Sequence, residues 1–297
     1  MGYKTKVFES ETDRLRFDII KRKTRCFMYK LGFIGSGNMG RAMALGAIKN
    51  KYASADEIIF YDINEDNTSK MVQEGISLAE SNEEVAEKSA IVILAVKPNL
   101  YDEILDDIQP SLTEETLLLS ITPSFSIKSL RERLSHKAKI IRAMPNTPAL
   151  VGEGMMGVCF ESDFEEEEKE RAFHFLRSFS SVIEVKEEMM VGVGSVSGSA
   201  PAFIYMLIEA MADAAVSYGI PRKDAYIFAA QTVKGAAEMV LETGIHPGEL
   251  KDQVTSPGGT TIAGCLELEK RGFRAAIVEG MKATGKRFKE MEEEAEQ

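Results

Sequence analysis

Short apolar runs alternate with helical patterns over residues 30–185. Runs such as Ile91–Ala95 are apolar at every position, which is typical of a central strand buried on both faces. Helical stretches between the runs favour parallel strands joined by crossover helices. We therefore expect an α/β fold with a doubly wound parallel sheet. The expected strands are Leu31–Ile34, Ile58–Tyr61, Ile91–Ala95, Leu117–Ile121, Ile140–Arg142, Met156–Phe160 and Val182–Val185.

The glycine-rich segment Gly35-Ser36-Gly37-Asn38-Met39-Gly40 joins the first expected strand to the first expected helix. In this context GxGxxG is typical of a dinucleotide site. Gly35 permits a tight turn, Gly37 lets the backbone approach a pyrophosphate, and Gly40 permits close packing of helix on strand. The alternative is a purely structural turn.

The pattern changes to helices alone from Ser197 onward. Apolar residues recur at helical spacing from Phe203 to Ala214, and Pro221 opens a second long helical stretch. We therefore expect a dinucleotide-binding Rossmann-type domain at residues 28–190 and an all-helical domain at residues 191–297.

Asp62 ends the second expected strand, where a dinucleotide fold places the acid that binds the adenosine ribose. A carboxylate there accepts hydrogen bonds from the 2′-hydroxyl and repels a 2′-phosphate. It favours NADH slightly, although the polar residues between Asn64 and Lys70 leave NADPH open. Alternatively, Asp62 only caps the next helix. The turn Ala95-Val96-Lys97-Pro98 lies where a cofactor would pass along the strand ends.

A second glycine loop, Thr255-Ser256-Pro257-Gly258-Gly259-Thr260-Thr261, lies near the C-terminus. Adjacent glycines leave backbone N–H groups approachable, and the flanking hydroxyls can donate and accept hydrogen bonds. A helix is expected to start near Thr260, and a helix N-terminus attracts anions. The loop predicts a cradle for a small carboxylate, with an ordinary helix-capping loop as the alternative.

Net charge and cysteine content argue against nucleic-acid-binding, metal-binding and disulfide-rich proteins. A net charge of −11 argues against a nucleic-acid partner, whose binding surface would be basic. Three cysteines without C-x-x-C spacing indicate neither a metal site nor a disulfide framework, which fits a reducing cytoplasm. We expect no membrane-spanning run and no signal peptide.

Three segments and a C-terminal pair, in order, resemble the pyrroline-5-carboxylate reductase family. They are GFIGSGNMG at 32–40, AVKP at 95–98, RAMPNTPALVGEG at 142–154, and the pair SGSAPAF at 197–203 and DQVTSPGGTT at 252–261. The resemblance implies NAD(P)H-dependent reduction of the cyclic imine 1-pyrroline-5-carboxylate to L-proline, the last step of proline biosynthesis. It also implies a cytoplasmic enzyme whose helical domain builds a homodimer, in some members a decamer of five dimers.

The resemblance also assigns residues by motif position. The cofactor would be held by Gly35–Gly40, Asn82 and Ala95–Pro98. The substrate would be held by Ser256, Gly258, Gly259, Thr260, Thr261 and Asn146, with Ser256 and Thr261 as the catalytic hydroxyls. The chain departs from the family pattern at Thr122-Pro123-Ser124, which replaces a small Ala-Ala-Gly run beside the cofactor.

The acid–base inventory of the chain fits imine reduction. His136, His174 and His246 stand in contexts that favour structural roles, so a reaction that needs a strong general base is poorly served. A pyrrolinium ring can arrive already protonated, so the protein must chiefly align two reactants. The Thr261 hydroxyl could shuttle or orient a proton near the ring nitrogen.

Two other functions remain open from the sequence. A 3-hydroxyacid dehydrogenase of similar two-domain build would need a catalytic lysine in the interdomain helix, and residues 196–217 contain none. A non-catalytic dinucleotide-sensing protein would have no need of an intact loop at 255–261.

Residues 1–27 show no apolar periodicity, and we expect them to be an extension outside the fold, with Met28 as the natural start. A chain that begins at Met28 should keep the activity and melting temperature of the full chain. A large loss of either would show that the extension packs on the fold.

Overall fold

The structure is a computed structural model that describes residues 27–134 and 138–295. The extension expected at residues 1–27, apart from Phe27, and His136 lie outside the described residues. Contacts divide the chain into two units. One holds the sheet, runs to Pro201 and takes up the chain again at Ala283, and the other spans Ala202–Lys282.

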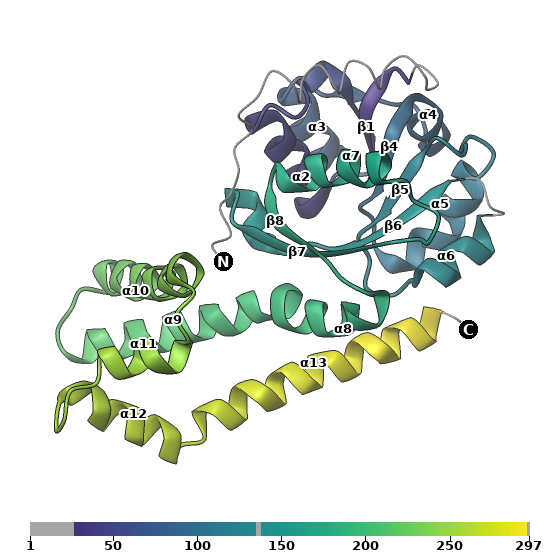
Figure 1. Cartoon of the computed structure of the whole chain (residues 1–297). Coiled ribbons are helices and arrows are strands. Elements are labelled where there is room, and N and C mark those ends of the chain that lie inside the picture. Colours follow the sequence, from purple (N-terminus) through teal and green to yellow (C-terminus); the bar gives the residue numbers. More distant parts are fainter. Residues whose placement is uncertain (1–26, 135–137, 296–297) are drawn as a thin grey trace. The chain divides into compact units, whose positions relative to one another are not determined.

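The sheet unit contains one eight-stranded sheet in the order β3-β2-β1-β4-β5-β6-β7-β8 (Figure 1). Neighbouring strands from β3 across to β6 pair in parallel, β7 runs antiparallel to β6, and β8 is parallel to β7. The strands are β1 (Tyr29–Ile34), β2 (Ile58–Tyr61), β3 (Ser77–Leu78), β4 (Ser89–Leu94), β5 (Leu117–Ser120), β6 (Lys139–Met144), β7 (Gly154–Phe160) and β8 (Ser180–Glu184).

The predicted fold class is confirmed, with two differences within the sheet. β7 is antiparallel because the connection at residues 145–153 holds only the short 3-10 helix η3 (Thr147–Val151), whereas a parallel crossover needs about a dozen residues or more. β3 was not predicted, since two residues are too few to form an apolar run.

Helices cover both faces of the sheet (Figure 1). Successive strand residues point to opposite faces, so Leu117 and Leu119 enter one core cluster and Leu118 enters the other. This double burial explains why the strand runs are apolar throughout. One face carries α2 (Asn38–Lys49), α3 (Glu65–Gln73) and α7 (Glu166–Arg177), and the other carries α4 (Asn82–Lys88), α5 (Tyr101–Ile108) and α6 (Ile127–Arg133).

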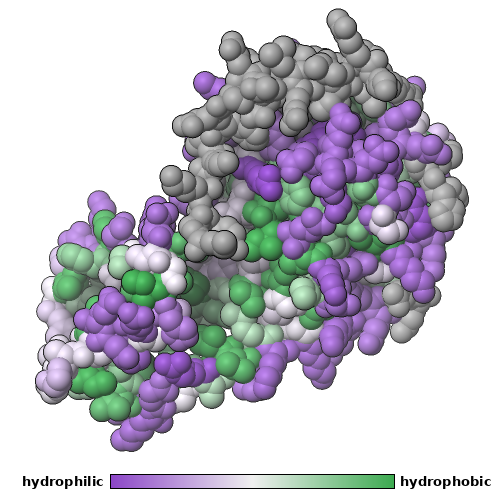
Figure 2. All heavy atoms as spheres, viewed as in Figure 1, coloured by the Kyte–Doolittle hydropathy of each residue, from purple (hydrophilic) through white to green (hydrophobic). Residues whose placement is uncertain are grey.

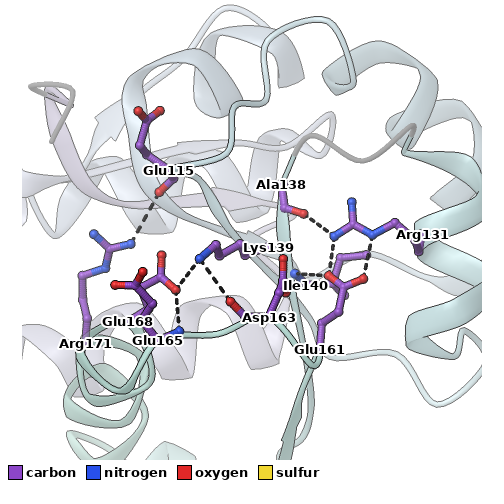
Figure 3. Close-up of polar contacts among 10 residues, drawn as sticks. All are labelled: Glu115, Arg131, Ala138, Lys139, Ile140, Glu161, Asp163, Glu165, Glu168 and Arg171. Atoms are coloured by element: carbon purple, nitrogen blue, oxygen red, sulfur yellow. Dashed lines mark hydrogen bonds and ion pairs between the residues drawn. The ribbon is translucent and has the colours of Figure 1, made fainter.

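Charged side chains surround the amino end of β6 (Figure 3). Lys139 Nζ lies 2.5 Å from Glu168 Oε2 on α7, and Arg131 Nε on α6 donates to Glu161 Oε1 at 2.7 Å. Arg131 also donates to the carbonyl of Ala138 at 2.6 Å. These contacts tie α6 and α7 to the sheet at the end opposite the carboxyl ends of the parallel strands.

The helical unit leaves most of its apolar side chains exposed. Within Ala202–Lys282 only Ala212, Ala225 and Ala229 are buried, whereas Met206 is 67% exposed and Phe228 63%. Figure 2 shows apolar side chains on the surface of this unit, and a patch of this kind marks an interaction surface. The helices involved are α9 (Ala200–Ser217), α10 (Arg222–Thr243), α11 (Pro247–Gln253), α12 (Thr260–Lys270) and α13 (Phe273–Ala295).

One helical stretch, Glu187–Ser217, has the length and apolar composition needed to cross a membrane. The expectation that no such run exists is therefore wrong. The stretch joins α8 (Met190–Val193), the π-helical turn η5 (Gly194–Ser199) and α9 end to end. Residues 189–208 of this stretch carry no charge.

Candidate functional site

The glycine loop stands at the carboxyl end of β1. Gly35 has a φ of +88°, and a Cβ there would lie 2.6 Å from Val96 Cγ1, so only glycine fits. A Cβ at Gly40 would lie 2.6 Å from the Gly35 carbonyl oxygen. Gly37 precedes α2 and has open space where a Cβ would stand. The loop thus combines a tight turn, close helix packing and an open helix N-terminus that suits a phosphate.

Asp62 follows β2 and holds this loop through its carboxylate. Its Oδ2 accepts hydrogen bonds from Ser36 N at 2.7 Å, Ser36 Oγ at 3.0 Å and Asn67 Nδ2 at 3.2 Å. Its Oδ1 accepts from Asn64 N at 2.8 Å. The helix α3 is capped by Asn64, whose Oδ1 accepts from Asn67 N at 3.1 Å. The tie between Asp62 and Ser36 is a role that sequence reasoning missed, and its signal was a hydroxyl inside GxGxxG.

The turn Ala95–Pro98 lies at the same edge of the sheet, directly after β4. Ala95 N donates to the Ile34 carbonyl at 2.8 Å, and Lys97 is exposed. Asn82, the first residue of α4, donates from Nδ2 to Asp107 Oδ2 at 3.2 Å. The structure therefore brings Gly35–Gly40, Asp62 and Ala95–Pro98 together along one edge, and gives the Asn82 amide a partner on α5.

Arg142 on β6 supports the next loop along this edge. Its Nη2 donates to the Pro123 carbonyl at 2.8 Å, and the side chain also pairs with Glu187 at 3.1 Å and Glu292 at 2.5 Å. Arg142 is only 2% exposed, so these partners compensate a buried charge. Glu187 also accepts from Ile127 N at 2.6 Å. Sequence reasoning gave Arg142 no role of its own.

Asn146 lies just beyond β6 and is buried. Its Nδ2 donates to the Ser197 carbonyl at 3.0 Å, and its Oδ1 accepts from Met155 N at 2.9 Å. The amide thus ties η5 to the start of β7. A substrate contact, as predicted for Asn146, would have to use its second N–H or its remaining lone pair.

The second glycine loop lies in the helical unit. Gly259 N donates to the Ser256 carbonyl at 3.0 Å, and Gly258 has a φ of +70°. With Pro257 in second position, these are the features of a type II turn. α12 begins at Thr260, so Thr260 and Thr261 occupy its first turn, where backbone N–H groups have no intrahelical partner. The side chains of Ser256, Thr260 and Thr261 are exposed.

The two described histidines have structural contacts. His246 caps α11, since its Nδ1 accepts from Gly248 N at 3.0 Å. The His174 ring meets the Tyr52 ring edge to face at 5.0 Å. Among the described residues, no cluster of three or more histidine, cysteine or carboxylate side chains could hold a metal ion.

A hollow of about 720 Å³ in the sheet unit lies elsewhere. It is bordered by α6, β7 and β8, and it contains none of the predicted site residues. Its lining mixes three cations with three carboxylates, namely Lys128, Arg131, Lys186, Glu161, Glu184 and Glu187.

Two family models match the chain. One, described as NADP oxidoreductase, coenzyme F420-dependent, matches residues 30–124. The other, described as pyrroline-5-carboxylate reductase dimerisation, matches residues 187–291.

Individual relatives match over most of the chain. The chain is 46% identical to a pyrroline-5-carboxylate reductase of Escherichia coli over 253 residues, which covers 85% of this chain and 94% of that protein. It is 38% identical to one of Pisum sativum, covering 89% of this chain and 96% of that protein. A crystal structure of a Plasmodium falciparum pyrroline carboxylate reductase with NADP bound matches with a TM-score of 0.82 at 34% identity, over 89% of this chain and 98% of that chain.

Asp62 provides a test of cofactor choice. Asp62→Ser should weaken NADH binding relative to NADPH binding by about 1.5–3 kcal/mol, because a charged hydrogen bond to the ribose is lost and repulsion of the NADPH 2′-phosphate is relieved. Loss of the tie to Ser36 should weaken both cofactors as well. Ser36→Ala is the matched control, since it loosens the loop but keeps the charge, and should weaken both cofactors alike. The measurement is kcat/KM with NADH and with NADPH. A wild-type protein that clearly prefers NADPH would contradict the NADH preference.

Proposed function

Because this chain belongs to the pyrroline-5-carboxylate reductase family, we propose that it reduces 1-pyrroline-5-carboxylate to L-proline with NADPH or NADH. The observation that carries this function is the family relationship over most of the chain, which includes both glycine loops. The chain is thus an oxidoreductase that acts on a carbon–nitrogen bond in proline biosynthesis.

The sheet unit fits a dinucleotide. The open position at Gly37 and the N-terminus of α2 suit a pyrophosphate, and the carboxyl ends of β1, β2 and β4 converge beside it. When bound, NAD(P)H supplies the hydride for the imine carbon. We assign the cofactor contacts to Gly35, Ser36, Gly37, Asn38, Met39, Gly40, Asp62, Asn82, Ala95, Val96, Lys97 and Pro98.

The loop before α12 is our candidate for substrate binding. Its unpaired backbone N–H groups and exposed hydroxyls suit a carboxylate. A protonated imine needs no strong base from the protein, so the Thr261 hydroxyl has only to orient or pass a proton at the ring nitrogen. We assign substrate contacts to Ser256, Gly258, Gly259, Thr260, Thr261 and Asn146, with Ser256 and Thr261 as the catalytic hydroxyls.

The chain assembles as a homo-oligomer through its helical domain, in accord with the dimerisation family match. The exposed apolar side chains of α9, α10 and α12 are what a second copy would cover. A second copy also accounts for the apolar stretch Glu187–Ser217 without a membrane, and we place the protein in the cytoplasm. We also propose that the dimers form a decamer of five dimers. We further propose that the boundary between the dinucleotide-binding domain and the helical domain lies between residues 190 and 191.

The activity is tested by incubating the protein with 1-pyrroline-5-carboxylate and NADH or NADPH, and measuring cofactor oxidation and proline formation. A 3-hydroxyacid with NAD⁺ or NADP⁺ is the control. Turnover of the hydroxyacid alone would favour a dehydrogenase. Dinucleotide binding with no turnover of either substrate would favour a sensing protein.

The oligomeric state of the protein can also be predicted. Light scattering at micromolar concentration should find dimers or multiples of dimers, because the apolar surface of the helical unit is too extensive to remain in water. A monomeric species with full activity would rule out an obligate dimer.

Thr261→Val gives the sharpest test of the substrate loop. The change keeps the side-chain shape and removes one hydrogen bond, at a cost of about 1–3 kcal/mol. The kcat/KM for the imine should fall by roughly one to two powers of ten, since each ~1.4 kcal/mol is tenfold. Dinucleotide affinity, measured by fluorescence, should stay within about twofold because the loop at Gly35–Gly40 is untouched. Equal weakening of both, or of neither, would move the substrate site away from this loop.

A further inference from the structure

Tyr101, the first residue of α5, is fully buried at the carboxyl edge of the sheet. Its hydroxyl donates to the Leu94 carbonyl at 3.1 Å and lies 3.2 Å from Ser120 Oγ. Leu94 ends β4, Ser120 ends β5, and the two residues face each other in the parallel ladder. The phenol therefore joins the two strands at the point where their pairing stops.

Each of these strand ends leads into a loop at the candidate cofactor edge. Residues 95–98 follow Leu94, and residues 121–124 follow Ser120. The Tyr101 ring stacks on Phe125 just after the second loop, with centroids 4.8 Å apart and planes inclined by 13°. Burial raises the pKa of Tyr101, while the Ser120 hydroxyl and the backbone N–H groups of Ile121 and Thr122 act in the opposite direction. The second loop is thus held at both of its ends by one side chain.

A buried hydroxyl is costly unless it is paired, and phenylalanine would fill the same core space without that cost. The hydroxyl therefore contributes its two contacts, one to the Leu94 carbonyl and one to the Ser120 hydroxyl, and each of these residues ends a strand. In a doubly wound fold the second mononucleotide-binding half begins at β4, so the loops after β4 and β5 face the nicotinamide end of a bound dinucleotide.

We infer that Tyr101 is a positioning residue for the nicotinamide half of the cofactor, because its hydroxyl sets the spacing between loops 95–98 and 121–124. The inference rests on the proposed function only in taking NAD(P)H as the ligand. Tyr101 itself is buried and acts through the two loops.

Tyr101→Phe removes the hydroxyl and keeps the ring. The Kd for NADH and NADPH, measured by cofactor fluorescence, should rise about three- to tenfold, as expected for the loss of one or two neutral hydrogen bonds. The Kd for ADP-ribose or its 2′-phosphate, which lack nicotinamide, should stay within about twofold of wild type. The KM for the imine at saturating cofactor should stay within the same range.

Tyr52→Phe is the matched control, because Tyr52 is also buried but lies toward the amino end of β1, where Lys30 Nζ contacts its carbonyl at 3.4 Å. It should leave every one of these constants unchanged. Ser120→Ala should reproduce part of the loss, and the double variant with Tyr101→Phe should bind no worse than Tyr101→Phe alone, because the two groups share one contact.

An unchanged NAD(P)H affinity in folded Tyr101→Phe would overturn the inference, as would an equal loss for ADP-ribose. Melting temperatures establish that each variant is folded. If the wild type binds NAD(P)H and responds as expected but does not reduce the imine, the proposed function fails and the assignment of Tyr101 stands.

Discussion

Burial of the sheet on both faces determines where chemistry can take place in this protein. Helices cover each face, so the central strands β1, β4, β5 and β6 have almost no free surface along their length. The parallel strands instead present their carboxyl ends at one edge, where the loops after β1, β2, β4 and β5 meet.

Polar side chains hold these loops in place. Asp62 fastens the glycine loop to the end of β2, Tyr101 joins the ends of β4 and β5, and Arg142 holds the carbonyl of Pro123. The contacts of Tyr101 and Arg142 are made in a region with little water, where a lost partner leaves an uncompensated group, whereas Asp62 is half-buried. A dinucleotide would therefore meet loops that are already ordered, and less of its binding free energy would be lost in arranging them.

Local patterns account for the parts of this fold that could be predicted from the sequence. The apolar strand runs, the GxGxxG turn and the break before α12 each depend on neighbouring residues. The Asp62–Ser36 contact joins residues 26 positions apart, and the Arg142–Glu292 contact joins residues 150 positions apart. Such pairs cannot be recognised from the neighbouring residues in the sequence. The antiparallel direction of β7 could have been inferred from its short connection to β6. Tyr101 was assigned no role from the sequence, since nothing in the sequence shows which strand ends its hydroxyl reaches.

The ion pair between Arg142 and Glu292 has a consequence for the order of synthesis. Glu292 lies in the last turns of α13, the helix that ends the described chain, and this part of the helix belongs to the sheet unit. During translation, β1 to β8 are synthesised well before Glu292. Until then the Arg142 guanidinium lacks one of its two carboxylate partners. The sheet unit is therefore synthesised first but completed last, because its Arg142–Glu292 ion pair can form only after the end of α13 has been synthesised.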